Sequence, residues 1–347
     1  MKSVGIKDVA REAGVSTTTV SLVLNDRAGS RISEATRAKV RDTAASIGYR
    51  PSAVARSLRL KRTQTIAVLS DRITTTPFAV AMLQAAQDVA RQHSYVLLVV
   101  NTDLDREVEQ DAIDALVSRQ VDGMIYACMW HRVVEPPAGL PAGTVFLNGR
   151  PAGGGFPAVV PDDHGGAVAA TRELIEQGHR RIGYIDTDEH PIPVAAELRR
   201  EGFVSVLREH GIPPDPSLFA SAPTTSTAGG LTAAGTLLDR PVHERPTALF
   251  CFNDRIAMGA YRAARHRGLE IPRDVSIVGY DDQQYIAADL DPPLTTVALP
   301  HYDMGRWAME VLLGARPAPT NDDGVFRMPC PIVRRESVTP PPARSRA

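Results

Sequence analysis

Residues 6–25 read IKDVAREAGVSTTTVSLVLN and decide how the chain begins to fold. Four apolar residues follow the i, i+3, i+4, i+7 spacing of an amphipathic helix: Ile6, Val9, Ala10 and Ala13. Gly14 can end that helix in the left-handed conformation, Val15 can fill the corner, and Ser16 can cap a second helix. The inner face of the second helix is apolar, with Val20, Val23 and Leu24. The stretch therefore predicts a helix–turn–helix.

The outer face of the second helix is predicted to read DNA. It carries small hydroxyl groups and one apolar side chain, next to the capping Ser16: Thr17, Thr18, Ser21 and Leu22. Such side chains can meet base edges in a major groove without a charge that must be desolvated. The motif alone also fits an ordinary helical hairpin, so the DNA-binding interpretation needs support from the rest of the chain.

The positive charge of the chain is concentrated at its start. Residues 1–62 hold 13 Lys and Arg against 5 Asp and Glu, a net charge of +8, whereas the remainder holds 26 against 35, a net charge of −9. A basic terminal segment in a near-neutral protein is the electrostatic footprint expected for a nucleic acid. The candidates for phosphate contacts are Arg11, Arg31, Arg37, Lys39 and Arg41.

A third helix and a short basic segment follow. Ser33 is placed to cap the helix, Gly48 to end it, and its inner face is Val40, Ala44 and Ile47. Residues 52–62 fit a helix of about two turns, well below the ~12 residues at which an isolated helix becomes marginal in water. We expect this hinge to fold on DNA and to insert side chains into a minor groove, with Ala55, Arg56 and Leu58 as candidates. A plain basic linker is the alternative, although Gly and Pro are absent from residues 52–65.

The chain resembles the LacI/GalR family of bacterial transcription regulators over nearly its whole length, to about Pro340. Five phrases of the first sixty residues carry the resemblance: Ile6-Lys7-Asp8-Val9-Ala10, Ala13-Gly14-Val15-Ser16, Thr19-Val20-Ser21, Gly48-Tyr49-Arg50-Pro51 and Val54-Ala55-Arg56-Ser57-Leu58. The resemblance implies that Thr17, Thr18 and Leu22 are the main major-groove positions and that Ala55 and Leu58 enter the minor groove. Leu22 stands where many members carry Arg.

The 285 residues after position 62 are too many for one compact sheet domain and suit two lobes. Apolar strand-like runs alternate with helical stretches, which predicts an α/β core of parallel sheets with helices on both faces. We expect a helix–turn–helix domain at 1–50, a hinge at 51–63, an effector-binding core at 64–340 and a disordered tail at 341–347. As the resemblance implies, the lobes are expected to be discontinuous: an N-lobe of about 64–162 and 295–322, and a C-lobe of about 163–291 and 326–338, similar to periplasmic sugar-binding proteins.

Polar residues follow the apolar runs, at the strand ends where parallel sheets bind ligands. Their carboxylates and amides suit a neutral polyol, with Asp281 as acceptor, Arg199 as donor, Asn253 as a two-way amide and Phe78 as a platform. For each Asx residue, capping of the next helix is the alternative, and for Phe78 a place in the core. The resemblance implies the same positions and adds Asp163. Trp130 and His131 follow a strand and could close one side of the site, and weaker candidates are Asp71, Asp103 and Arg150.

Other classes of protein fit the sequence less well. Three distant cysteines, Cys128, Cys251 and Cys330, suit a reducing compartment and buried positions. No run approaches a membrane span, no signal peptide opens the chain, and the nine His show no metal-ligand spacing. Adjacent Asp281 and Asp282 could suggest a glycosidase, but neighbours on an extended chain point apart. A transport-type sugar-binding protein would lack the basic head.

The sequence thus predicts a cytoplasmic, nucleoid-associated, non-enzymatic regulator without cofactor or metal. We expect a repressor of carbohydrate-utilisation genes that a sugar or glycoside releases from a near-palindromic operator. Because a single recognition helix contacts only a short half-site, a homodimer is expected. A co-repressor response to a nucleobase, a nucleoside or another small metabolite is the alternative, although only 5% of the residues are aromatic.

Overall fold

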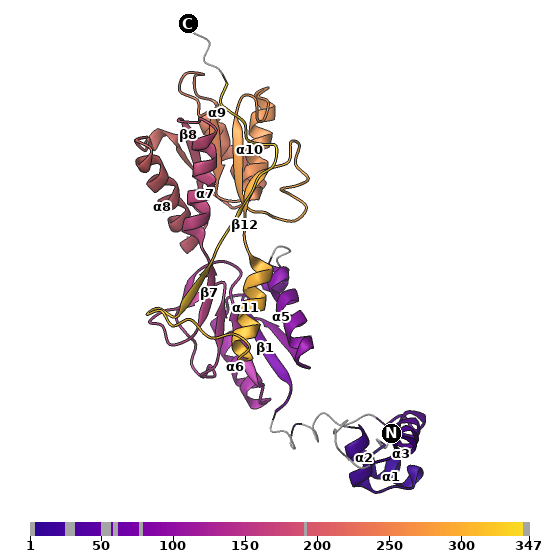
Figure 1. The fold of residues 1–347 in the computed structure, drawn as a ribbon. Helices are drawn as coiled ribbons and strands as arrows, with labels where there is room; N and C mark the ends of the chain where they lie inside the picture. The colour runs from indigo at the N-terminus through magenta and orange to yellow at the C-terminus, as the bar shows by residue number, and fades with distance from the viewer. Residues whose placement is uncertain are drawn as a thin grey trace. The chain divides into compact units, whose positions relative to one another are not determined.

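The computed structural model describes residues 4–24, 32–49, 57, 62–75, 79–190 and 193–342. Its contacts divide the chain into two units, one of Met1–Thr65 with Gln120–Asp122 and one of the remaining residues (Figure 1). The first unit holds the helices that the opening stretch predicts. The second holds two six-stranded sheets with their helices.

The described residues of the head form three short helices: α1 (Ile6–Ala13), α2 (Thr17–Leu24) and α3 (Glu34–Ser46). Gly14 ends α1 in the left-handed conformation, with φ 67° and ψ 35°. The hydroxyl of Ser16 accepts from Thr19 N at 3.0 Å and so caps α2, and Ser33 caps α3 in the same way at 3.3 Å from Thr36 N. A single apolar cluster joins the helices: Val9, Ala10, Ala13, Val20, Val23, Val40 and Ala44. The predicted helix–turn–helix is therefore confirmed.

The first sheet of the core has the order β13-β7-β5-β3-β1-β2, and the strands pair in parallel from β13 through β7, β5 and β3 to β1. Its strands are β1 (Thr65–Ser70), β2 (Val96–Asn101), β3 (Gly123–Ala127), β5 (Val145–Leu147), β7 (Ala158–Pro161) and β13 (Val325–Met328). Its helices are α5 (Val80–Gln92), α6 (Arg106–Ser118) and α11 (His301–Leu312). Helices α5 and α11 pack on each other, and Gly305 makes this possible because a Cβ there would lie 2.1 Å from Met82 O.

The second sheet has the order β14-β12-β11-β10-β8-β9. Its strands are β8 (Ile182–Thr187), β9 (Phe219–Ala222), β10 (Ala248–Cys251), β11 (Ser276–Asp281), β12 (Thr295–Ala298) and the antiparallel β14 (Ile332–Val333). Its helices are α7 (Asp163–Glu176), α8 (Val194–Glu209), α9 (Thr227–Leu238) and α10 (Asp254–His266).

Alternate side chains of the second sheet enter two separate apolar clusters. Ile185 and Leu249 belong to the cluster that includes α9 and α10, whereas their neighbours Tyr184 and Phe250 belong to the cluster that includes α7 and α8. Both faces are therefore covered, which explains why these strands read as continuous apolar runs. The α/β core with parallel sheets is as the sequence predicts.

The chain crosses between the sheets at three places, and two of them differ from the expected bounds. Segment 295–322 was expected in the N-lobe, but β12 pairs with β11 in the second sheet, and the return to the first sheet follows at α11. The expected C-lobe start at 326 is also wrong, because β13 pairs with β7 and only β14 belongs to the second sheet. The physical reason is that an apolar strand reads the same in either sheet, so the pattern could not show which partner it pairs with.

Two minor features complete the core. A short parallel pair, β4 (Val133–Val134) with β6 (Arg150–Pro151), lies outside the large sheets. The described part of the chain also has two 3₁₀ turns, η1 (Ile73–Thr75) and η2 (Pro216–Leu218). All three cysteines are buried and unbridged, as the sequence predicts.

Candidate functional sites

The head presents the predicted DNA-reading face on α2. Ser16, Thr17 and Thr18 are exposed, whereas Ser21 and Leu22 are half-buried. Val20 and Val23 point into the head core and Leu24 packs against it, whereas the candidate positions Thr17, Thr18, Ser21 and Leu22 do not belong to that cluster. Four further candidates for DNA contact lie outside the described residues: Arg31, Ala55, Arg56 and Leu58.

In the core, three residues that the sequence singled out meet in one buried cluster: Asp163, Arg199 and His131. Asp163 is the first residue of α7, and Asp162, which precedes it, caps that helix by accepting from Gly165 N at 2.9 Å. Oδ1 of Asp163 accepts from Arg199 Nε at 2.9 Å, and Arg199 Nη2 lies at the same distance. Oδ2 lies 2.9 Å from His131 Nδ1. Burial raises the pKa of the Asp163 carboxyl, but Arg199 and His131 outweigh it and hold the pKa below its ordinary value.

Arg199 is enclosed by rings and acceptors. Its guanidinium carbon lies 3.6 Å from the ring centre of Tyr280 and 4.7 Å from that of Phe252. Its Nη1 donates to Phe252 O at 2.6 Å and lies 3.5 Å from Asp281 Oδ1. Burial acts against the charge, but Asp163 outweighs it and raises the pKa of the guanidinium. Most of the donors of Arg199 are thus engaged within the protein.

Close approach of two helices brings Arg199 to Asp163. A Cβ at Gly202 of α8 would lie 2.6 Å from His164 O and 2.9 Å from the Cβ of Ala167, both of α7. Gly202 therefore allows α8 to pack closely against the first turns of α7, and this contact brings Arg199 to Asp163 at the start of α7. Any side chain at this position would push the helices apart.

Asp281 and Asp254 form a second acidic part of the cluster. Asp281 accepts from Gln283 Nε2 at 2.7 Å, and its backbone has φ 105°, a strained value for a residue with a Cβ. Asp254 accepts from Gln283 N and from Thr296 Oγ1, each at 2.6 Å. Burial, followed by the charge of Asp281, raises the pKa of Asp254 well above its ordinary value. Burial also raises the pKa of Asp281, against the opposing effect of Arg199.

Two histidines from the side of the first sheet complete the cluster. His131 lies in the loop after β3, and His301 is the first residue of α11. Burial and the nearby Arg199 lower the pKa of His301 to about 4, against the opposing effect of Asp163. Neighbouring Arg132 anchors the loop of His131, because its Nη2 lies 3.2 Å from Asp71 Oδ2.

The remaining candidates are placed differently. Asn253 is buried and its Oδ1 accepts from Ile256 N at 2.9 Å, so it caps α10. Trp130 is half-buried, with the Arg132 guanidinium 5.8 Å from its ring centre, and Phe78 lies outside the described residues. Sequence reasoning missed Phe252 and His301 as parts of the cluster, and it gave no individual role to Asp254 or Tyr280.

The weaker candidates and the rival acid pair have their own partners. Asp103 is exposed and lies 3.8 Å from Arg72, and Arg150 belongs to β6. Asp282 binds Arg335 at 2.7 Å, whereas Asp281 faces Arg199 and Gln283. The two adjacent carboxylates therefore do not converge as an acid–base pair.

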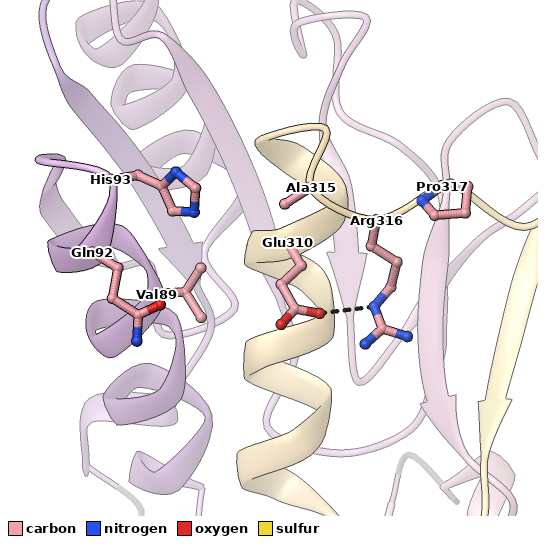
Figure 2. A pocket seen from close by; sticks show the side chains of 7 residues that line it. All are labelled: Val89, Gln92, His93, Glu310, Ala315, Arg316 and Pro317. Carbon is pink, nitrogen blue, oxygen red and sulfur yellow. Dashed lines mark hydrogen bonds and ion pairs between the residues drawn. The ribbon is translucent and has the colours of Figure 1, made fainter.

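A surface pocket of about 450 Å³ lies elsewhere on the first lobe, between α5 and α11. Figure 2 shows Val89, Gln92 and His93 on one side and Glu310 with Arg316 on the other. Glu310 binds Arg316 at 2.8 Å. The helix α5 leads from the carboxyl end of one parallel strand back to the amino end of the next, so its last turn lies at the amino ends of the strands. The pocket is therefore separate from the buried cluster.

The described residues offer neither a metal site nor a membrane-spanning helix. Within the ranges described above, no group of three or more His, Cys, Asp and Glu side chains is arranged to hold a metal ion. No helix among those residues combines the length and the apolar character needed to cross a membrane.

Known proteins resemble this chain along its whole length. Residues 5–52 match the family "Bacterial regulatory proteins, lacI family", and residues 171–338 match the "Periplasmic binding protein-like domain". The HTH-type transcriptional regulator RegA of Clostridium saccharobutylicum is 35% identical over 96% of this chain and 98% of its own.

Two solved structures extend the comparison. The lac repressor dimer bound to operator and an anti-inducer is 26% identical, with a TM-score of 0.77 over 97% of this chain and all of that one. A complex of the transcriptional regulator CelR with cellobiose is 28% identical, with a TM-score of 0.64 over 96% of this chain and all of the other.

Proposed function

Because the chain belongs to the LacI family of bacterial regulatory proteins, we propose that it represses carbohydrate-utilisation genes and that a sugar or glycoside releases it from a near-palindromic operator. The protein is a DNA-binding transcriptional regulator, and we place its action in the cytoplasm, where operator DNA lies. The observation that carries the proposal is the buried cluster of Asp163, Arg199 and Asp281 in a chain with a helix–turn–helix head.

The charge of the cluster favours an uncharged effector. Asp163, Asp281 and Asp254 supply three carboxyl groups, and Arg199 is already placed against two of them. An anionic ligand would have to compete with these carboxylates for the guanidinium, whereas hydroxyl groups can donate to carboxylate oxygens. The relative solved with cellobiose carries such a neutral ligand.

The rings of the cluster do not favour a nucleobase. Tyr280 and Phe252 both lie against the Arg199 guanidinium, so these faces are covered within the protein. In our proposal the contacts to the effector come from Asp281, from Asn253 through its Nδ2 and from the ring of Trp130, with Phe78 as a further platform. Arg199 and Asp163 hold the site together.

Two features of the chain favour a homodimer, the recognition helix of the head and the edge strand β2 of the first sheet. One recognition helix reaches a short half-site, so useful affinity needs two heads on a palindrome. Strand β2 stands at the end of the first sheet, and Val96 and Leu98 on it are exposed, as are Val108 and Val117 of the neighbouring α6. A long apolar edge strand invites pairing with a second chain unless it is covered. We propose a second copy of this chain as its cover.

The experiment begins with selection of duplexes from a random library by the full-length protein. A palindromic consensus is expected, and enrichment of no sequence above bulk DNA would refute the proposal. Leu22→Ala should relax base preference, whereas Lys39→Ala should weaken binding evenly across sequences and lower the salt dependence. Leu58→Ala tests the hinge, with weaker specific binding expected.

The selected duplex then serves to find the inducer. Neutral mono- and disaccharides are added to the protein–DNA complex, and at least one is expected to release the DNA. Asp281→Ala should keep operator affinity and lose this release. A variant that still responds to the same sugar at the same concentration would remove Asp281 from the site.

A further inference from the structure

The two ring nitrogens of His131 have different surroundings. Nδ1 lies 2.9 Å from Asp163 Oδ2, whereas Nε2 has no hydrogen-bond partner within the described part of the chain. The residue is only 5% exposed. Buried polar atoms of folded proteins are nearly always paired, and an unpaired one costs free energy. Nε2 therefore marks a position where a further polar group is expected.

Asp163 decides which nitrogen of His131 carries the proton. Arg199 Nε and Nη2 both lie 2.9 Å from Oδ1, so the carboxylate is ionised and its Oδ2 accepts from Nδ1–H. In a neutral imidazole with a proton on Nδ1, Nε2 has a lone pair and can only accept. Asp163 itself has both oxygens engaged within the protein.

We propose that His131 Nε2 accepts a hydrogen bond from an O–H or N–H group of the effector, and that Asp163 is a positioning residue that fixes the imidazole for this contact. The inference rests on the proposed function, because it concerns the same cluster. It also narrows the ligand class. A phosphate or carboxylate oxygen can only accept and would meet another acceptor at Nε2, whereas a hydroxyl group can donate to it.

The position of His131 links ligand contact to both lobes. Its loop follows β3 of the first sheet and is anchored through Arg132 to Asp71, while Asp163 and Arg199 belong to α7 and α8 beside the second sheet. An effector hydroxyl on Nε2 therefore contacts a side chain that both lobes hold. Such a ligand would stabilise the arrangement in which His131 and Asp163 are in contact.

Two substitutions at His131 separate the contact with the effector from the contact with Asp163. In H131N the side-chain amide occupies the place of Nδ1, so it can still donate to Asp163 but has no distal acceptor. In H131Q the amide reaches the place of Nε2 and keeps an acceptor there, but the bond to Asp163 is lost. The two variants therefore remove one contact each.

The assay is thermal shift of the full-length protein with D-ribose, cellobiose, sucrose and cytidine, with operator binding as the control for folding. For the probe that binds the wild type best, H131N should bind about 10-fold weaker or more, because a ligand donor loses its buried acceptor, and H131Q should stay within a few fold. The opposite order, with H131N retained and H131Q lost, would show that His131 only joins the lobes and would overturn the proposal.

A second measurement needs no ligand. The ¹⁵N NMR signals of histidine-labelled wild-type protein at neutral pH should show His131 protonated at Nδ1 and unprotonated at Nε2. A proton on Nε2 would overturn the proposal whatever the probes do. If no probe stabilises the wild type, the proposed sugar response loses its support, while the NMR result still decides the state of His131.

Discussion

Helices α7 and α8 are joined by two ion pairs of the same kind, one buried and one exposed, and their energies should differ widely. Asp163 and Arg199 form the buried pair, with side chains 0% and 4% exposed. Arg172 and Glu209 form the other, with side chains 50% and 53% exposed and 3.1 Å between Nη2 and Oε2. The neutral variants D163N and E209Q therefore compare loss of one carboxylate charge in two environments on the same helix pair.

The structure gives the magnitude for D163N. In this variant Arg199 would stay buried, and its remaining carboxylate would be Asp281 at 3.5 Å. The NH₂ group of the new amide would also replace one carboxylate oxygen and face a donor of either Arg199 or His131. Breaking a buried ion pair by removal of one partner costs about 3–5 kcal/mol. An exposed pair is screened by water, so E209Q should cost about 0–1 kcal/mol.

Tryptophan fluorescence during thermal unfolding is the assay, because both tryptophans, Trp130 and Trp307, lie in the core and none in the head. At about 2–4 °C per kcal/mol, D163N should lower the Tm by roughly 6–20 °C. E209Q should stay within about 4 °C of the wild type. Equal shifts for the two variants would refute the reasoning, since burial would then not decide the energy of the pair.

Three further predictions follow from the described contacts. Ser16→Ala removes the cap of α2 at a cost of about 1 kcal/mol and should lower operator affinity more than Ser33→Ala, which removes the same kind of cap from α3; equal losses in fluorescence anisotropy would contradict this. The folded-state pKa of Asp254 lies above its ordinary value of 3.8, so its share of the stability falls as pH rises from about 4 toward that folded pKa; Asp254→Asn should flatten urea-unfolding stability in this window, and an unchanged pH profile would count against it. Val96→Glu places a charge on the exposed edge strand β2 and should shift sedimentation toward the monomer, whereas an unaltered dimer would place the interface elsewhere.

Local signals predicted the head well. Gly14, Ser16 and Ser33 lie within a few residues of the backbone groups that they satisfy, so the sequence contains both partners of each contact. Strand ends were also predictable, because the residue after an apolar run is visible in the sequence. These signals placed Asn253 and Asp281 among the candidates, whereas Arg199, which lies inside α8, was named as a donor to a polyol and by the family resemblance.

The contacts within the buried cluster could not be predicted in the same way, because they join residues that are distant in the sequence. Asp163, Arg199 and Asp281 lie far apart in the sequence, and their meeting depends on how α8 packs against α7 at Gly202. Tyr280 reaches Arg199 from β11 of the second sheet, and His301 comes from α11 beside the first sheet, so neither neighbour is close to Arg199 in the sequence. The crossovers were misplaced for a related reason, since the pairing of β12 with β11 is decided by the whole sheet and not by four residues.

The cluster contains groups whose burial or strain raises the free energy of the protein, and a bound ligand can lower that free energy. Asp281 has a strained backbone and a carboxyl group whose pKa burial raises, and His131 Nε2 is buried without a partner in the described structure. Hydroxyl groups that donate to both would lower this free energy only while the two lobes keep His131 and Asp163 together. In our proposal that difference between lobe arrangements is the source of the response, because a ligand shifts an equilibrium only by its differential affinity for the two states. A coupling of about 1–3 kcal/mol changes operator affinity roughly 5- to 150-fold, and loss or gain of one or two hydrogen bonds of about 1 kcal/mol each is enough to supply it.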